Sequence, residues 1–175
     1  MENYVENFIN LQRKIMDNFI SLSDNKKTAF LLGLSMKTVS LLCESEQKNI
    51  SEKTIDYCWE WLCHGSYNGD FLYELLVNEQ DGITIFAENT EDISEQAIFN
   101  CIIYAVAFTS RKAYESENVK WYPEPIELVS DELIYNFMEC YHVCFPNDKS
   151  IKNITEYLNS SENKSEWKNY FEKII

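Results

Sequence analysis

Apolar residues recur at intervals of three and four positions along most of the chain, which is the spacing of one helix face. In residues 2–22 this face is formed by Tyr4, Phe8, Leu11, Ile15, Phe19 and Leu22. The spacing predicts further helices over 26–45, 51–64, a segment beginning at 70, 94–115, 130–145 and 150–175, with a break at 159–163. The pattern therefore predicts an all-α protein.

One segment differs from the others because it is apolar on nearly every side between Ala97 and Phe108. Such a helix is expected to be surrounded by other helices. We therefore expect a single domain over residues 1–175, built as a bundle of about seven to nine helices around a central apolar helix near residues 94–115.

Several positions predict where helices begin and end. Gly65 is placed just past a helix end. Asp70 is a plausible N-cap for the next helix, and Asp92 or Ser94 for the central one. Residues 83–87 fit a short strand or a short helix, and we favour the helix because no second strand is present to pair with it. Gly33 inside a predicted helix indicates a tight contact with another helix.

Composition agrees with a folded helical protein. The chain has 45% hydrophobic and 14% aromatic residues but only four glycines and three prolines, fewer turn residues than sheet proteins of this size need. Six cysteines lie mostly in apolar runs, and the N-terminus does not resemble a signal peptide, so we expect reduced core thiols in a cytoplasmic protein. The longest apolar run is too short to span a membrane.

Charge is distributed unevenly. Residues 54–148 hold 18 acidic and three basic residues, whereas the two flanking segments are close to neutral. Between Lys53 and Arg111 there is no lysine or arginine. Such a surface repels nucleic acids and anionic membranes and attracts basic partners. Acidity also favours solubility, so the charge alone does not identify a function.

Motifs for chemistry are weak. Cys140, His142 and Cys144 group three possible metal ligands, but His142 points away from the face that the two cysteines share, and no CxxC knuckle is present. No nucleophile elbow, phosphate-binding loop or dinucleotide fingerprint occurs. We expect no catalytic residue, no metal and no cofactor.

Carboxylates and aromatic residues leave two further options open. Glu60 lies between Trp59 and Trp61, where desolvation would raise the pKa of a carboxyl group. We favour the alternative, in which Glu60 points to solvent while the two tryptophans pack on neighbouring helices. Tyr57, Trp59 and Trp61 could form a binding platform, but aromatic residues at this spacing are more often core.

The acidic middle, with Trp59-Glu-Trp-Leu62 and Leu75-Leu-Val-Asn-Glu79, resembles the all-helical Imm6-like immunity proteins of bacterial polymorphic-toxin systems. The resemblance rests on size, helical layout, acidity and aromatic-rich helices over most of the chain. It implies an immunity protein that binds and neutralises a cognate toxin C-terminal domain, without direct contact to nucleic acid or membrane.

The toxin-binding surface is predicted from acidity and from an aromatic loop. Its expected residues are Asp70, Glu74, Glu79, Asp81, Glu88, Glu91, Asp92, Trp121 and Tyr122. Three other classes remain open: an acidic mimic of nucleic acid that inhibits a host enzyme, a helical regulatory or scaffold module, and an enzyme. A mimic would bind several basic proteins, a scaffold would bind weakly and independently of salt, and an enzyme would depend on His64 or His142.

Overall fold

The computed structural model describes residues 13–146 and 148–175, and its regular structure there is helical, without a strand. Residues 13–21 are helical. The helices that follow are α2 (Asp24–Val39), α3 (Glu46–His64), α4 (Gly69–Val77), α5 (Ile83–Asn89), α6 (Ile93–Ser116), α7 (Glu124–Glu127), α8 (Leu133–Cys144), α9 (Ser150–Ser160) and α10 (Lys164–Ile174). The all-α prediction is confirmed. The predicted helix over 2–22 lies partly outside the described residues.

Helix α6 lies among the other helices, at the position expected for residues 94–115. It contacts α2, α3, α4, α5, α7 and α8. Its buried residues extend from Ala97 to Tyr114 and include Phe99, Ile102 and Phe108. Asp92 caps the helix by accepting hydrogen bonds from the backbone N–H groups of Ser94 and Glu95 at 2.8 and 3.0 Å. Of the two predicted N-caps, Asp92 and Ser94, the structure has Asp92.

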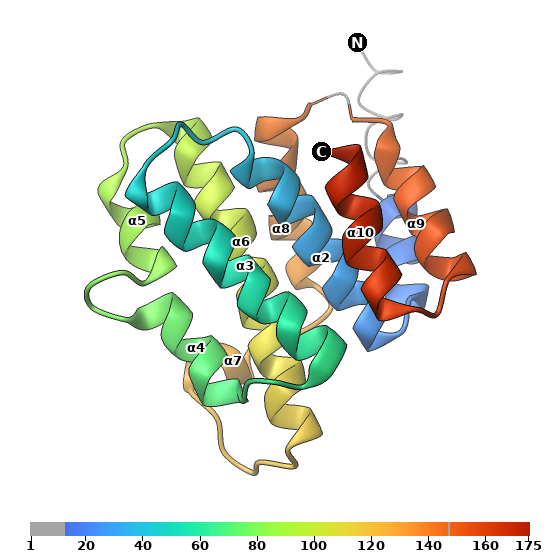
Figure 1. Cartoon of the computed structure of the whole chain (residues 1–175), viewed down its shortest axis with the longest axis horizontal. Coiled ribbons are helices and arrows are strands. Elements are labelled where there is room, and N and C mark those ends of the chain that lie inside the picture. Colours follow the sequence, from blue (N-terminus) through green and yellow to red (C-terminus); the bar gives the residue numbers. More distant parts are fainter. Residues whose placement is uncertain (1–12, 147) are drawn as a thin grey trace.

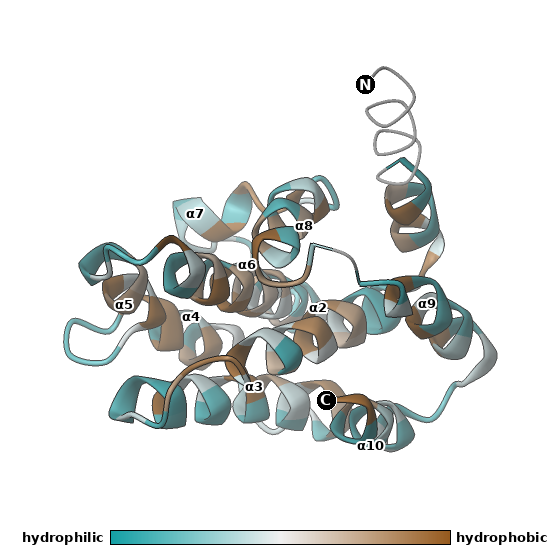
Figure 2. Cartoon of the chain, turned by 90° about the horizontal axis from the view of Figure 1, so that it is seen from above, coloured by the Kyte–Doolittle hydropathy of each residue, from teal (hydrophilic) through white to brown (hydrophobic). Residues whose placement is uncertain are grey.

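The other helices form layers on either side of α6 and α2. Figure 2 shows α3 and α10 below these two helices and α7 and α8 above them. Helices α4 and α5 pack on α6 at one end of the molecule, and α9 packs on α2 at the other (Figure 1). The segment 69–92, which holds most of the predicted site, therefore lies at the end of the bundle opposite α9.

Helix α10 packs closely against α2 at Gly33. A Cβ atom at Gly33 would overlap the ring of Phe171, which is itself buried. The tight helix–helix contact predicted for Gly33 is therefore present, because only a residue without a side chain lets this ring reach the α2 backbone.

Three lysines of α2 form ion pairs with acidic residues from later parts of the chain. Lys26 Nζ lies 2.5 Å from Glu162, Lys27 Nζ lies 2.7 Å from Asp131, and Lys37 Nζ lies 2.7 Å from Asp148. The aliphatic parts of the Lys26 and Lys27 side chains are buried, while their ammonium groups reach these partners. These ion pairs connect α2 to the starts of α8 and α9 and to the α9–α10 turn.

Several predicted boundaries need correction. Helix α2 ends at Val39 rather than 45, and Leu41 is exposed. Helix α3 begins at Glu46 rather than 51, because the Ser45 side chain caps it by accepting from Lys48 N at 3.2 Å. The N-cap of α4 is Asn68, whose side chain accepts from Phe71 N at 2.8 Å, and not Asp70.

Other local predictions agree with the structure. Gly65 ends α3 with a φ of 67°, a left-handed conformation, and its N–H donates to Trp61 O at 2.8 Å. Residues 83–89 form the short helix α5. Residues 150–175 form two helices separated at 161–163.

The cysteines are free, but only Cys58 and Cys101 are buried. Burial raises the pKa of the Cys58 thiol to about 12, which keeps that side chain protonated and unreactive. The prediction of core thiols holds for these two, whereas Cys43 is exposed and Cys63, Cys140 and Cys144 are half-buried.

Candidate functional site: an acidic edge and an apolar groove

The predicted acidic residues lie along one end of the bundle, on α4, α5 and the turns before and after α5. We call this surface the acidic edge; it consists of Asp70, Glu74, Glu79, Asp81, Glu88, Glu91 and Asp92, all of which are exposed. Helices α4, α5 and α6 contact one another, so adjoining elements carry these carboxylates (Figure 1). They extend from Asp70, beside the C-terminal part of α6, to Asp92 at its N-terminus.

Two of these acids have structural partners. Asp70 accepts a hydrogen bond from the Tyr114 hydroxyl at 2.6 Å, and Asp92 caps α6. Burial, followed by the hydrogen bond to Asp70, raises the pKa of Tyr114. A substitution at Asp70 or Asp92 would therefore disturb the fold as well as the surface.

The remaining acids are more available to a partner. Glu74 accepts only from the neighbouring Asn78 amide at 3.2 Å. Within the part of the chain that the structure describes, the carboxylates of Glu79, Asp81, Glu88 and Glu91 have neither a hydrogen-bond donor nor an ion-pair partner. These groups are solvated and free to meet a basic surface.

A hollow of about 340 Å³ lies between α3 and α4 at the acidic edge. Glu74 and Asp81 line it together with the half-buried rings of Tyr57 and Phe71, and Lys53 supplies one positive charge. The ring of Phe71 packs edge-on against Tyr57 at 5.1 Å and stacks on Tyr67 at 4.5 Å. Tyr57 thus belongs to an aromatic cluster that supports the acidic edge.

The predicted aromatic pair separates into two different environments. Trp121 is 85% exposed. Tyr122 is half-buried, with its ring 4.5 Å from the Arg111 guanidinium and 5.5 Å from the ring of Tyr114. Trp121 can therefore contact a partner directly, whereas Tyr122 fixes the loop to α6.

Of the two tryptophans of α3, one belongs to the core and the other lies at its border. Trp59 is buried and its ring packs 6.1 Å from that of Phe171, while Trp61 is half-buried. Glu60 is exposed, with a carboxylate oxygen 4.0 Å from His64 Nε2. The reading of Glu60 as a solvent-facing residue agrees with this placement.

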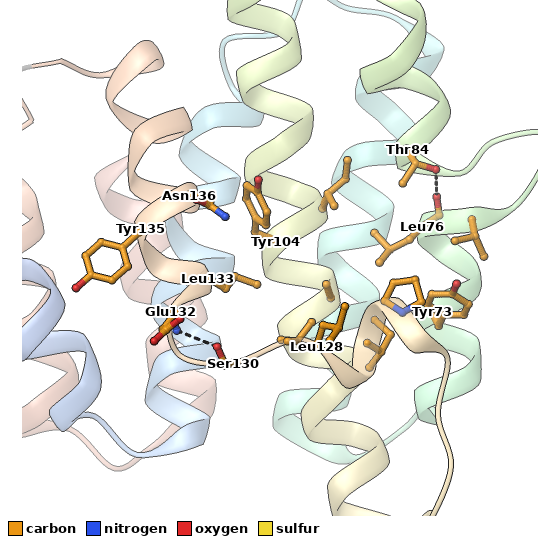
Figure 3. A pocket seen from close by; sticks show the side chains of 16 residues that line it. Tyr73, Leu76, Thr84, Tyr104, Leu128, Ser130, Glu132, Leu133, Tyr135 and Asn136 are labelled. Atoms are coloured by element: carbon orange, nitrogen blue, oxygen red, sulfur yellow. Dashed lines mark hydrogen bonds between the residues drawn. The ribbon is translucent and has the colours of Figure 1, made fainter.

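A second hollow, wider than the one at the acidic edge, is an apolar groove that the sequence did not predict. It has a volume of about 620 Å³ and lies between α4–α5 on one side and α7–α8 on the other, with α6 as its floor. Figure 3 shows Tyr73, Leu76, Tyr104, Leu128 and Leu133 around it, with Tyr135 pointing away. Leu128, which lines the groove, is 77% exposed.

The sequence signal for this groove is weak. Leu128 and Val129 follow a proline-containing loop, and nothing in their local pattern distinguishes an exposed leucine from a buried one. The floor belongs to the helix predicted to be covered on all sides. Its opening depends on which neighbouring helices exist, which a helix-face pattern does not specify.

Two further features of the described residues concern metal binding and membranes. No group of three or more His, Cys, Asp or Glu side chains there could hold a metal ion. Helix α6 is long and apolar enough to cross a membrane, but 61% of its most apolar stretch is buried inside the fold. That degree of burial, together with the packing of α2, α3, α4, α5, α7 and α8 against α6, is typical of a core helix.

The described residues thus form an all-helical fold with an exposed acidic edge and an open apolar groove. The family model described as immunity protein Imm6 matches residues 26–144. The chain therefore belongs to the Imm6 family of immunity proteins. The match extends from the start of α2 to the end of α8 and includes both the acidic edge and the groove, whereas α9 and α10 lie beyond it. No curated protein and no solved structure matches the chain.

Proposed function

We propose that the chain is an immunity protein that binds and neutralises a cognate toxin domain in the bacterial cytoplasm, the domain being the C-terminal part of a larger secreted protein. The observation that carries this proposal is the match to the immunity family over residues 26–144. The toxin is a protein partner, and the chain inhibits it by binding rather than by catalysis.

The acidic edge supports an electrostatic part of the proposal. A toxin that cleaves nucleic acid has a basic active site because its substrate is a polyanion. Free carboxylates at Glu79, Asp81, Glu88 and Glu91 would meet such a surface and accelerate the encounter. Charge complementarity sets the association rate and specificity more than the affinity, so apolar contacts are also needed.

A growth assay tests the proposed function. If the gene beside that of this chain encodes a large secreted protein, the C-terminal domain of that protein is the toxin to test. It is expressed in a bacterial host, alone and together with the chain. We expect the domain to arrest growth and the chain to restore it, and an unrelated acidic helical protein to give no protection. Arrest without rescue by the chain would contradict the proposal.

A pull-down on the same strain separates immunity from nucleic-acid mimicry. An immunity protein should retain its one toxin domain at both low and high salt because apolar contacts hold the complex. A mimic would instead retain several basic host proteins at low salt and release them at high salt.

A further inference from the structure

We propose that the groove between α4–α5 and α7–α8 is the site where the toxin domain inserts an amphipathic helix, with apolar residues facing α6 and lysine or arginine residues along its flank. This inference rests on the proposed function and adds to it the surface that holds the toxin. The acidic edge then serves the encounter, and the groove retains the bound partner.

The floor of the groove indicates a helical occupant. Along α6, Asn100, Ile103, Tyr104 and Arg111 are only half-buried, with Ala107 between them, while the other sides of the helix are covered by its neighbours. Ile103, Tyr104 and Ala107 line the groove. Asn100 precedes this group and Arg111 follows it at helical spacings of three or four residues, so the five residues form a ridge along α6. Ridges of this kind pack against a second helix, and the groove is a place in the bundle where such a neighbour is missing.

The walls supply apolar anchors. Leu76 and Val77 of α4 line the groove, as do Leu128, Val129 and Leu133 between α7 and α8. Figure 3 shows Leu76 on one side of the groove and Leu133 on the other. A volume of about 620 Å³ is enough for several large side chains of one helix face. The hydroxyl groups of Tyr73 and Tyr104 lie in the lining without a hydrogen-bond partner in the described residues, so they can bind polar groups of the occupant.

The acidic residues around the groove favour basic residues along the flank of the bound helix. Glu132 is the charged residue among the lining residues described, and Glu124 and Glu127 are exposed on the neighbouring α7. The nearby cation Arg111 is already engaged: its Nε donates to Glu115 at 2.6 Å and its Nη1 donates to Glu127 O at 2.9 Å. A helix with basic flanking residues therefore fits, and an acidic one does not.

Two variants test the groove by opposite changes. Leu128→Ser removes an exposed anchor, and Ala107→Phe fills the floor from within. Val143→Ser is the control, because Val143 is 49% exposed on α8 and does not line the groove. The affinity of each purified variant for the purified toxin domain is measured by biolayer interferometry, and urea unfolding shows that each variant is folded.

We expect Leu128→Ser and Ala107→Phe each to weaken binding by about 30-fold, the size of an interface hot spot, mainly through faster dissociation. Val143→Ser should bind like the wild type. Affinities within about threefold of the wild type for both groove variants would overturn the groove assignment and leave the proposed function standing. A wild-type chain that does not bind the domain would overturn the proposed function, and the groove assignment with it.

Sedimentation of the chain alone tests whether the groove holds a second copy of the chain instead of a helix of the toxin. If the wild-type chain is a dimer that Leu128→Ser converts to a monomer with unchanged toxin affinity, the groove holds a second copy of the chain and the proposal is wrong. A monomeric wild-type chain together with the binding losses above supports it.

Discussion

Asp148 is the acid whose protonation has the clearest structural consequence. Its side chain is only 8% exposed and accepts hydrogen bonds from Lys37 Nζ at 2.7 Å and from the Tyr141 hydroxyl at 2.5 Å. Burial alone would raise the pKa of this carboxyl group, but the bonds from Lys37, Tyr141 and Ser150 hold it well below its usual range. Burial of the Tyr141 hydroxyl, followed by its hydrogen bond to Asp148, raises the pKa of Tyr141.

This lowered pKa predicts a loss of stability in acid. The contribution of Asp148 is fully present above the unfolded-state pKa, about 4, and decreases as the pH falls below it. Between pH 7 and pH 3 the wild type should therefore lose about 1 kcal/mol more than Asp148→Asn, although the variant is less stable at pH 7 by about 2 kcal/mol. Urea unfolding at both pH values measures this. Equal losses in the two proteins would show that Asp148 is not the responsible group.

The contact between α2 and α10 makes a prediction at the scale of elements. Gly33→Ala should destabilise the protein by about 1–3 kcal/mol because the new methyl group displaces the ring of Phe171. In a Phe171→Leu background the smaller side chain leaves room, so the same change should cost about 1 kcal/mol less. The four proteins form a double-mutant cycle, measured by urea unfolding. Additive effects would mean that the ring is not the cause.

The sequence predicts those features of the helices that depend on residues nearby in the chain. The spacing of apolar residues predicts helix faces, and Gly65 and Asp92 mark ends because a left-handed turn and an N-cap depend on neighbouring residues only. The start of α3 was missed because residues 46–50 are largely polar, yet a capped helix extends through them on the exposed side. The cap of α4 was missed by two positions because Asn68 and Asp70 are both good caps.

The candidate site was predictable only in part for the same reason. The exposed acids of the acidic edge follow from a segment without lysine or arginine. That Asp70 binds the Tyr114 hydroxyl depends on a contact between α4 and the distant end of α6, which no local pattern contains. The groove depends on the absence of a helix beside Ile103 and Tyr104, and an absent neighbour leaves no mark on the residues that remain.

At the scale of the whole molecule, the net charge of −14 is carried mainly by the half of the chain that contains the acidic edge, and this predicts how a basic toxin domain would associate. Wild-type association should slow about tenfold between 50 mM and 500 mM NaCl, because salt screens the attraction. Replacing Glu74, Glu79 and Asp81 with lysine should slow association at low salt by about tenfold, as high salt does for the wild type. The variant should also lose most of the salt dependence. Stopped-flow fluorescence of the two proteins measures these rates.

A matched variant separates the position of the charge from its amount. Asp17, Glu156 and Glu172 are exposed and lie on residues 13–21, α9 and α10, away from α4 and α5. Replacing these three with lysine changes the net charge equally, so it should slow association far less if the acidic edge meets the toxin. Equal slowing by both triple variants would mean that net charge alone steers the encounter, and unchanged rates in both would remove electrostatics from the mechanism. Since the groove is tested by dissociation and the acidic edge by association, the two surfaces can be assigned independently.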